Sequence, residues 1–110
     1  MLSQKQRLVR ASFGEVFSKG SLVHTSHFLI RTLPSPDTAC HGAVVVPKRV
    51  LKQAIDRHRL KRRVYAVLEK GFAEALQPID IVVVAKRGAG TLSFSDIQNE
   101  LASISINNRP

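Results

Sequence analysis

A dense run of positive charge lies in the middle of the chain, between positions 48 and 63. This segment holds eight basic side chains and one acid, Asp56, so it carries a net charge of 8 − 1 = +7 within a chain of net charge +9. The basic residues are Lys48, Arg49, Lys52, Arg57, Arg59, Lys61, Arg62 and Arg63. Guanidinium and ammonium groups are the side chains that bind phosphate oxygens. The chemistry that this spacing indicates is the binding of a polyanion.

A basic run can also be an ordinary solvated surface. Surfaces that serve only solubility mix both signs of charge and pair Glu with Lys or Arg four residues apart. This run has almost no acidic partners, and like charges at this density repel one another in the free protein. Nucleic acid is the commonest polyanion that would relieve this repulsion, so we predict a nucleic-acid-binding protein.

RNA fits the sequence better than duplex DNA does. The basic segment does not follow the short helix and turn of a helix-turn-helix module, and no zinc-finger or zipper spacing is present. Phe13, Phe17 and Phe28 could offer stacking surfaces to unpaired bases, although such a residue more often belongs to the core. A basic helix that docks on acidic proteins or membranes would need a broad exposed apolar side, and here that side is expected to pack on a sheet.

The side chains give no sign of protein-based catalysis. The eight carboxylates are scattered singly, whereas a metal-dependent nuclease needs clustered acids. His24 and His27 have a spacing that metals tolerate, but two residues are a weak signal, and a structural or exposed pair is the commoner outcome. No nucleophile-elbow sequence is present. We therefore expect no catalytic residue and no metal site in the protein, and another molecule would perform any chemistry.

Hydrophobic periodicity and turn residues predict seven main elements that position the basic segment. In chain order they are a helix from Ser12 to Gly20, strands over 21–25, 27–33 and 43–46, a helix over 53–76, a strand over 79–85, and a helix that begins after Ser93. Two parallel strands joined by the long helix imply a mixed sheet. The expected fold is an α/β (α+β) sandwich with a four-stranded mixed sheet and three helices, in the order α-β-β-β-α-β-α.

Local signals define several boundaries of these elements. Ser12 with Glu15, and Ser93 with Asp96, fit the capping box at a helix start. The apolar run over 43–46, closed by a proline, is typical of a strand buried on both faces. In the long helix Leu60, Val64, Val67 and Leu68 share one side with Gly71, while Ile55 falls on the opposite side. The helix can therefore bury one side and present its cations elsewhere.

Composition is that of an intracellular globular protein. The chain has 110 residues, of which 44% are hydrophobic, so we expect one RNA-binding domain over residues 1–110. Cys40 has no partner for an internal disulfide, and a small buried side chain in a reducing compartment is the simplest interpretation. No signal peptide or apolar run of membrane-spanning length is apparent. We expect a cytoplasmic protein with no membrane partner.

Four segments, in the same order along the chain, resemble the protein subunit of bacterial ribonuclease P. Residues 57–62 (RHRLKR) resemble the family's Arg-Asn-Arg-x-Lys-Arg signature at the start of a long helix. Residues 44–49 (VVVPKR) are similar to its strand that ends in a basic pair. Residues 13–20 (FGEVFSKG) resemble its Phe-x-x-Val-Phe-x-x-Gly segment, and residues 80–88 (DIVVVAKRG) resemble its second buried strand. The likeness covers most of the chain.

The resemblance implies a ribonucleoprotein endoribonuclease. A catalytic RNA that uses Mg²⁺ would cleave the 5′ leader from precursor tRNA, and this protein, one copy per RNA, would assist. The family also implies a left-handed β-α-β crossover, against the usual preference. The expected RNA-binding residues are Lys48, Arg49, Arg57, His58, Arg59, Lys61, Arg62 and Arg63. The expected leader-cleft residues are Phe13, Phe17, Arg31, His58 and Lys61. The alternative is a non-catalytic RNA-binding module of ribosomal or RNA-chaperone type.

Three positions depart from the family's pattern. His58 stands in place of the signature Asn, which keeps a planar polar group but changes its donor geometry and adds a pH-dependent charge. Arg31 stands where many members have a Tyr in the cleft, and its guanidinium could still stack on a base. Tyr65 replaces a helical Arg. These changes bear on how RNA is bound rather than on the fold.

Overall fold

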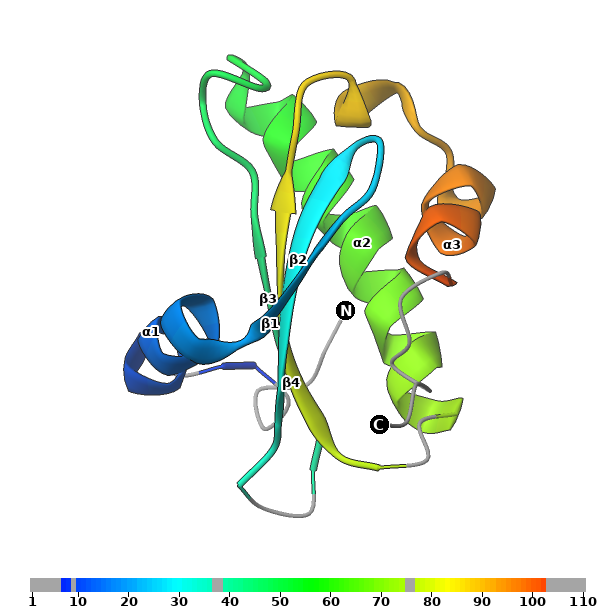
Figure 1. Ribbon diagram of the computed structural model, residues 1–110. Helices are drawn as coiled ribbons and strands as arrows, with labels where there is room; N and C mark the ends of the chain where they lie inside the picture. The colour runs from blue at the N-terminus through cyan, green and yellow to red at the C-terminus, as the bar shows by residue number, and fades with distance from the viewer. Residues whose placement is uncertain (1–6, 9, 37–38, 75–76, 103–110) are drawn as a thin grey trace.

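The fold is a four-stranded sheet with helices on both faces (Figure 1). The structure, a computed structural model, describes residues 7–8, 10–36, 39–74 and 77–102. The elements are α1 (Arg10–Lys19), β1 (Ser21–His24), β2 (Phe28–Pro34), β3 (His41–Val45), α2 (Ala54–Glu74), β4 (Ile79–Ala85), the short 3-10 helix η2 (Ala89–Thr91) and α3 (Phe94–Ala102). The predicted order of helices and strands is confirmed, and η2 is an additional element in the connection between β4 and α3.

The sheet is mixed, as predicted, with the strand order β1-β2-β4-β3. β1 pairs with β2, and β2 with β4, in antiparallel fashion, whereas β3 and β4 are parallel and are joined through α2. The expectation that β3 is buried on both faces was wrong. Its burial alternates, with Val44 buried and Val45 only half-buried, because the strand lies at the end of the ladder rather than in its centre.

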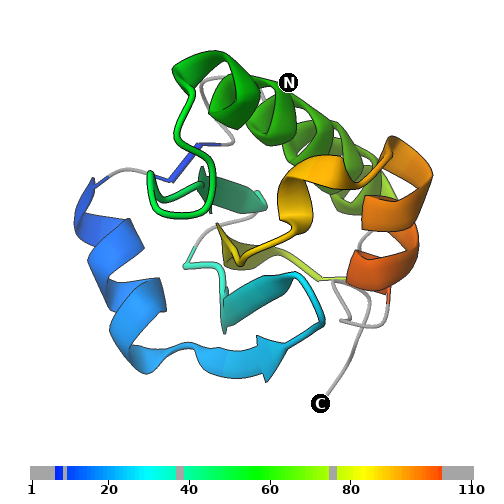
Figure 2. The same ribbon diagram turned by 90° about the horizontal axis from the view of Figure 1, so that it is seen from above.

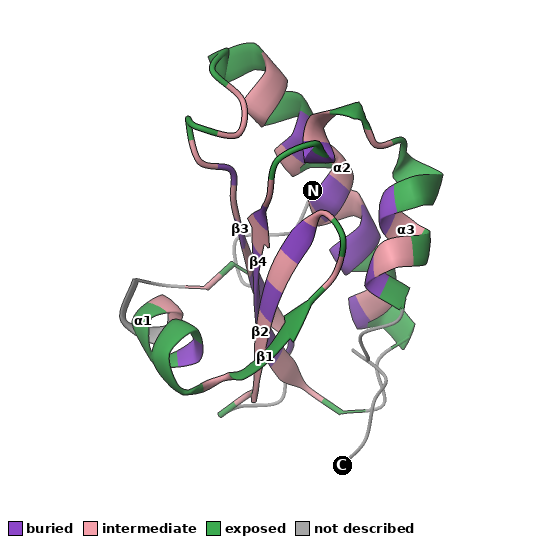
Figure 3. Cartoon of the chain, turned by 45° about the horizontal axis from the view of Figure 1, so that its top comes forward, coloured by how far each residue is buried: buried purple, intermediate pink, exposed green. Residues whose placement is uncertain are grey.

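The main core lies between the sheet and the two later helices. α2 directs Leu60, Val64, Val67 and Leu68 into it, as its periodicity predicts, and Phe72 joins them. Ile55 belongs to the first turn of α2 and is 61% exposed, as expected for a residue on the side opposite the buried one. The helix therefore buries one side only, and the rest of its surface stays available (Figure 3).

The first helix covers the opposite face of the sheet, as the view from above shows (Figure 2). Val16 of α1 is buried, and so is Val82, whose side chain points away from the main core because neighbouring residues of a strand alternate between faces. The predicted start at Ser12 was wrong. α1 begins at Arg10, since an Arg-Ala pair continues a helix readily and a Ser-x-x-Glu spacing also fits helix interiors.

A glycine and a capping box mark two other helix ends where the sequence predicts them, the end of α1 and the start of α3. Gly20 follows α1, and a Cβ there would lie 2.5 Å from the carbonyl oxygen of Val16 and 2.8 Å from that of Thr32, so only glycine fits. Ser93 and Asp96 form the expected capping box of α3, with the Asp96 amide donating to Ser93 Oγ and the Ser93 amide to Asp96 Oδ2, each at 3.1 Å. Cys40 is a buried free thiol, as expected.

Candidate nucleic-acid interface

The basic segment begins in a tight turn that follows β3. The carbonyl of Pro47 accepts hydrogen bonds from the amides of Val50, at 3.0 Å, and Leu51, at 3.3 Å. This closure leaves Lys48 and Arg49 exposed in the turn. Both cations therefore extend from a short loop whose backbone is held by its own hydrogen bonds, directly ahead of α2.

Arg57 connects this loop to the helix. Its Nη1 donates to the carbonyl oxygens of Leu51, at 2.9 Å, and Lys52, at 2.7 Å. The sequence indicated a phosphate contact at this position, but in the free protein one guanidinium nitrogen holds the loop against the first turn of α2. A guanidinium has five N–H donors, so the remaining donors can still meet an external anion.

The other cations are distributed around α2 outside its buried side. Arg59 and Arg62 are exposed and Arg63 is half-buried, and all three line a hollow between α2 and the start of α3. His58 is exposed and Lys61 is half-buried. They lie seven and four residues before Tyr65, so the three residues share the side of α2 that turns toward β3. The Tyr65 hydroxyl accepts a 3.3 Å hydrogen bond from the Val44 amide, which fixes that orientation.

A second candidate site lies on the other face of the sheet, where α1 meets β2. The rings of Phe13 and Phe17 stack with their centroids 5.8 Å apart and their planes 7° from parallel. The guanidinium carbon of Arg31 lies 5.2 Å from the centroid of the Phe17 ring, and Arg31 Nη1 donates to the Gly20 carbonyl at 3.4 Å. Phe17 is 42% exposed, so it is not a core residue. We call these three residues, Phe13, Phe17 and Arg31, the aromatic–guanidinium stack.

The expected leader-cleft residues are thus only partly brought together. Phe13, Phe17 and Arg31 form one cluster, whereas His58 and Lys61 belong to α2, which packs on the opposite face of the sheet (Figures 1 and 2). Phe28, the third aromatic considered as a stacking surface, is fully buried in the main core, which is the commoner position for such a residue. Strand alternation accounts for the difference, because Phe28 and Arg31 of β2 face opposite sides of the sheet.

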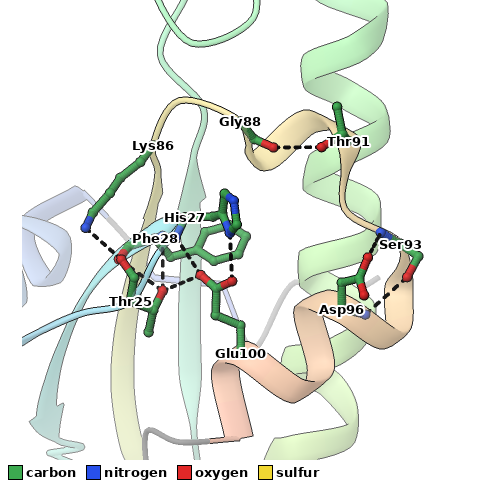
Figure 4. A network of polar contacts seen from close by, with 9 residues as sticks. All are labelled: Thr25, His27, Phe28, Lys86, Gly88, Thr91, Ser93, Asp96 and Glu100. Carbon is green, nitrogen blue, oxygen red and sulfur yellow. Dashed lines mark hydrogen bonds and ion pairs between the residues drawn. The ribbon is translucent and has the colours of Figure 1, made fainter.

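Sequence reasoning missed a polar network that holds α3 against the β1–β2 turn (Figure 4). Glu100 of α3 accepts hydrogen bonds from the Thr25 hydroxyl, at 2.5 Å, and from the His27 amide, at 2.6 Å, and its other oxygen lies 2.9 Å from His27 Nδ1. Lys86 donates to the Thr25 carbonyl at 2.8 Å. The two partners of each contact are more than 60 positions apart in sequence, so no local pattern could have paired them.

The surroundings of Glu100 lower its pKa below the ordinary value. Burial alone would raise the pKa, but the hydrogen bonds from Thr25 and His27 and the attraction to His27 outweigh it. His27 therefore has a structural partner, in agreement with the preference for a structural role over a metal-binding one. Within the described part of the chain, no group of three or more His, Cys, Asp or Glu side chains could hold a metal ion.

A second histidine–carboxylate pair joins the parallel strands β3 and β4. His41 Nδ1 of β3 lies 2.7 Å from Asp80 Oδ1 of β4, and the two residues are register partners. Asp80 is 3% exposed, so the imidazole provides the partner that a buried carboxylate requires.

Among the residues that the structure describes, no helix is long and apolar enough to span a membrane.

Comparisons with known proteins agree with this geometry. The family model for ribonuclease P matches residues 2–107. The ribonuclease P protein component of Citrifermentans bemidjiense is 33% identical over 99 residues, which cover 89% of this chain and 84% of the relative. Its counterpart in Streptococcus pneumoniae is 23% identical over 92 residues, which cover 84% of this chain and 74% of the relative.

Solved structures share the fold. The RNase P protein of Thermotoga maritima superposes with a TM-score of 0.77 at 20% identity, covering 88% of this chain and 92% of that one. A Staphylococcus aureus RNase P protein mutant, described as defective in mRNA degradation activity, gives a TM-score of 0.80 at 22% identity, covering 91% and 85%. The match of the family model over nearly the whole chain confirms the resemblance found in the sequence, and the chain belongs to the ribonuclease P protein family.

Proposed function

We propose that this protein subunit of ribonuclease P binds the catalytic RNA through α2 and the loop before it, and the 5′ leader of precursor tRNA through the aromatic–guanidinium stack. The observation that carries the proposal is the separation of two RNA-binding chemistries onto opposite faces of one sheet. A protein that joins a catalytic RNA to its substrate needs two such surfaces. The whole chain would act as a single RNA-binding domain, with one protein per RNA, in the cytoplasm.

The surface for the catalytic RNA is electrostatic. Lys48, Arg49, Arg59 and Arg62 are exposed cations that come from one loop and the first half of one helix. The N-terminal end of α2 adds the positive end of the helix dipole to the same region. His58, Lys61, Arg63 and the free donors of Arg57 complete the expected RNA-binding set. Such a surface recognises the phosphate backbone of a folded RNA more than its sequence.

The surface for the leader is built for unpaired bases. Two parallel phenyl rings present π-faces and edges on which single-stranded bases stack with little sequence preference. Arg31 adds a planar cation beside Phe17, which can stack on a further base or bind a leader phosphate. His58 and Lys61 would act on this leader only if it extends past the sheet toward α2.

The chemistry itself is assigned to the RNA. Mg²⁺ would be held by RNA phosphates and by the scissile phosphate, because the described carboxylates form no cluster that could hold it. The protein would supply binding energy and reduce the repulsion between two polyanions. The need for Mg²⁺ should therefore be lower with the protein present than with the RNA alone.

The decisive experiment compares leader removal with and without the protein. A bacterial ribonuclease P RNA and a precursor tRNA are mixed at low Mg²⁺, and 5′ leader release is followed over time. We expect faster cleavage with the protein. An unchanged rate would contradict the proposal, and binding to many RNAs without dependence on a leader would instead favour the RNA-chaperone or ribosomal alternative.

Two variants separate the two surfaces. Arg62→Ala removes an exposed cation from α2 and should weaken binding to the catalytic RNA. Phe17→Ala should leave that binding unchanged. It should slow cleavage of substrates that carry a leader, and it should have a smaller effect on the binding of mature tRNA, which has none. Because Phe17 is 42% exposed, the variant should unfold close to the wild-type denaturant concentration, and this measurement is the control. Equal loss in both assays for both variants would contradict the separation.

A further inference from the structure

We infer that a groove between α2 and the η2–α3 segment is a docking site for one unpaired nucleotide of the catalytic RNA, with Phe94 as the stacking surface. The inference rests on the proposed function and deepens it, because it identifies where on α2 the RNA inserts a base. It concerns residues outside the aromatic–guanidinium stack.

The groove consists of two adjoining hollows that share two arginines. One, of about 360 Å³, is lined by Arg59, Arg62, Arg63, Ala66 and Phe94. The other, of about 430 Å³, is lined by Arg59, Arg63, Asp56, Val50, Leu51, Gly88, Gly90 and Thr91. Volumes of this size are at the lower end of the range for small-molecule sites, roughly 300–1,000 Å³. We call both hollows together the α2–α3 groove, and its volume suits one nucleotide.

The composition of the groove matches a nucleotide. Three arginines face one acid, Asp56, so the groove carries an excess of two positive charges. Phe94 is 37% exposed, whereas Ile97 and Leu101 of the same helix are buried in the core. A single exposed Phe needs no explanation on its own. An aromatic ring together with three guanidinium groups around one hollow is the arrangement that stacks a base and binds its flanking phosphates.

Arg63 provides an independent observation. Its Nη1 atom is buried and has no hydrogen-bond partner among the residues that the structure describes. A buried guanidinium donor without an acceptor is unfavourable for the free protein. Arg63 lines both hollows, so the unpartnered donor belongs to a side chain that a ligand in either hollow would contact. The fold thus retains a donor that it does not use.

The wall opposite α2 is held rigidly. Gly88 adopts a left-handed conformation with φ = 91°, and its carbonyl accepts a 3.0 Å hydrogen bond from the Thr91 hydroxyl (Figure 4). A Cβ on Gly90 would lie 2.7 Å from Leu51, so this turn packs directly on the loop before α2. The Ser93 capping box and the Glu100 network then orient α3 and, with it, Phe94. A preformed groove loses little entropy when it binds.

The position of the groove favours the catalytic RNA over the leader as the source of the nucleotide. α3 and η2 lie with α2 on the face of the sheet opposite α1, and so opposite the aromatic–guanidinium stack (Figure 2). Arg59 and Arg62 are also part of the surface proposed for the catalytic RNA. A bulged or looped base of that RNA can enter the groove while its neighbours contact the exposed cations of α2.

The test measures binding of the full-length protein to catalytic RNA alone, with no precursor tRNA. Stacking on an aromatic ring changes affinity by roughly 5-fold to 150-fold per base, and because Phe94 is partly covered we expect about 5-fold to 20-fold weaker binding for Phe94→Ala. Phe94→Tyr should bind as wild type, and Phe94→Leu should be weakened nearly as much as Phe94→Ala. Leu22→Ala, which removes an exposed apolar side chain from β1, is the matched control and should bind as wild type.

A photo-cross-linking amino acid at position 94 provides a readout that does not depend on affinity. We expect one major cross-link, to an unpaired nucleotide of the catalytic RNA. Wild-type affinity for Phe94→Ala or for Phe94→Leu would overturn the inference. So would a cross-link only to the leader when the cross-linking is repeated with precursor tRNA added to the complex. If the wild-type protein binds no catalytic RNA at all, the proposed function fails instead, so the two failures are distinguishable.

Discussion

The Glu100 network leads to a specific prediction about stability. Replacing Glu100 with Ala removes the acceptor of three hydrogen bonds, at 2.5, 2.6 and 2.9 Å, that come from Thr25 and His27. The Thr25 hydroxyl can turn to the Phe28 carbonyl, which already lies 3.3 Å away, but the His27 amide loses its acceptor.

The magnitude follows from the number and the exposure of these bonds. A hydrogen bond to a charged group contributes about 1.5–3 kcal/mol net, and the Glu100 side chain is 15% exposed while that of His27 is 33% exposed, so water can replace part of the loss. We expect Glu100→Ala to lower the free energy of unfolding by about 2–4 kcal/mol, and the midpoint temperature by on the order of 10–20 °C. Urea unfolding monitored by circular dichroism measures it.

The lowered pKa of Glu100 adds a pH dependence of known sign. A carboxylate with a lowered folded-state pKa contributes stability above its unfolded pKa, which is near 4.5, and loses this contribution as the pH falls through the folded value. The stability difference between wild type and Glu100→Gln should therefore be full at pH 7 and should shrink below about pH 4.5.

Glu15→Ala is the matched control for this experiment. Glu15 is a 57% exposed residue of α1 that lies 3.7 Å from Lys19, so its loss should change stability by less than about 0.5 kcal/mol. A stabilising role of the Glu100 network is refuted if Glu100→Ala lowers the free energy of unfolding no more than Glu15→Ala does. It is also refuted if the stability difference between wild type and Glu100→Gln is the same at pH 7 and pH 3.

Two further predictions concern RNA affinity and the backbone. If α2 and its loop neutralise about six phosphates, affinity for the catalytic RNA should fall on the order of a thousandfold between 50 and 200 mM salt, and Arg62→Ala should reduce the log–log slope by about one. A flat salt response in filter binding would contradict this. Gly20→Ala should destabilise the protein by about 1–3 kcal/mol, because its Cβ would collide with two carbonyl groups. Gly14→Ala, where nothing lies within 4 Å, should stabilise α1 by about 0.5–1 kcal/mol; equal effects in urea unfolding would contradict the geometry.

Features that depend on a few neighbouring residues were predictable from the sequence. The buried side of α2 follows from helical periodicity, and the cap of α3 follows from the Ser93–Asp96 spacing. The same spacing was misleading at Ser12, because such a pair also occurs inside helices and the two residues before it continue α1. A local pattern therefore predicts that a helix exists better than where it begins.

Features that depend on the order of strands were not predictable in this way. The exposure of Val45 depends on β3 being at one end of the ladder. The pairing of His27 with Glu100 and of His41 with Asp80 depends on which segments the sheet brings together. The resemblance assigned Phe17 and Arg31 to one cleft, but nothing in the sequence indicated that the guanidinium would lie over the Phe17 ring. The sequence also did not indicate that Arg57 would already hold the loop before α2.

The position of β4 has a consequence for synthesis of the chain. β4 lies between β2 and β3 in the sheet, yet it is the last strand to leave the ribosome. Until it emerges, β2 and β3 have no common neighbour, and the apolar side of α2 has no central strand to cover it. The basic half of α2 is already outside by then, so the nascent chain carries its RNA-binding charge before it has a closed core. Folding of the sheet is therefore completed late, by pairing across long sequence separations, which is a slow step.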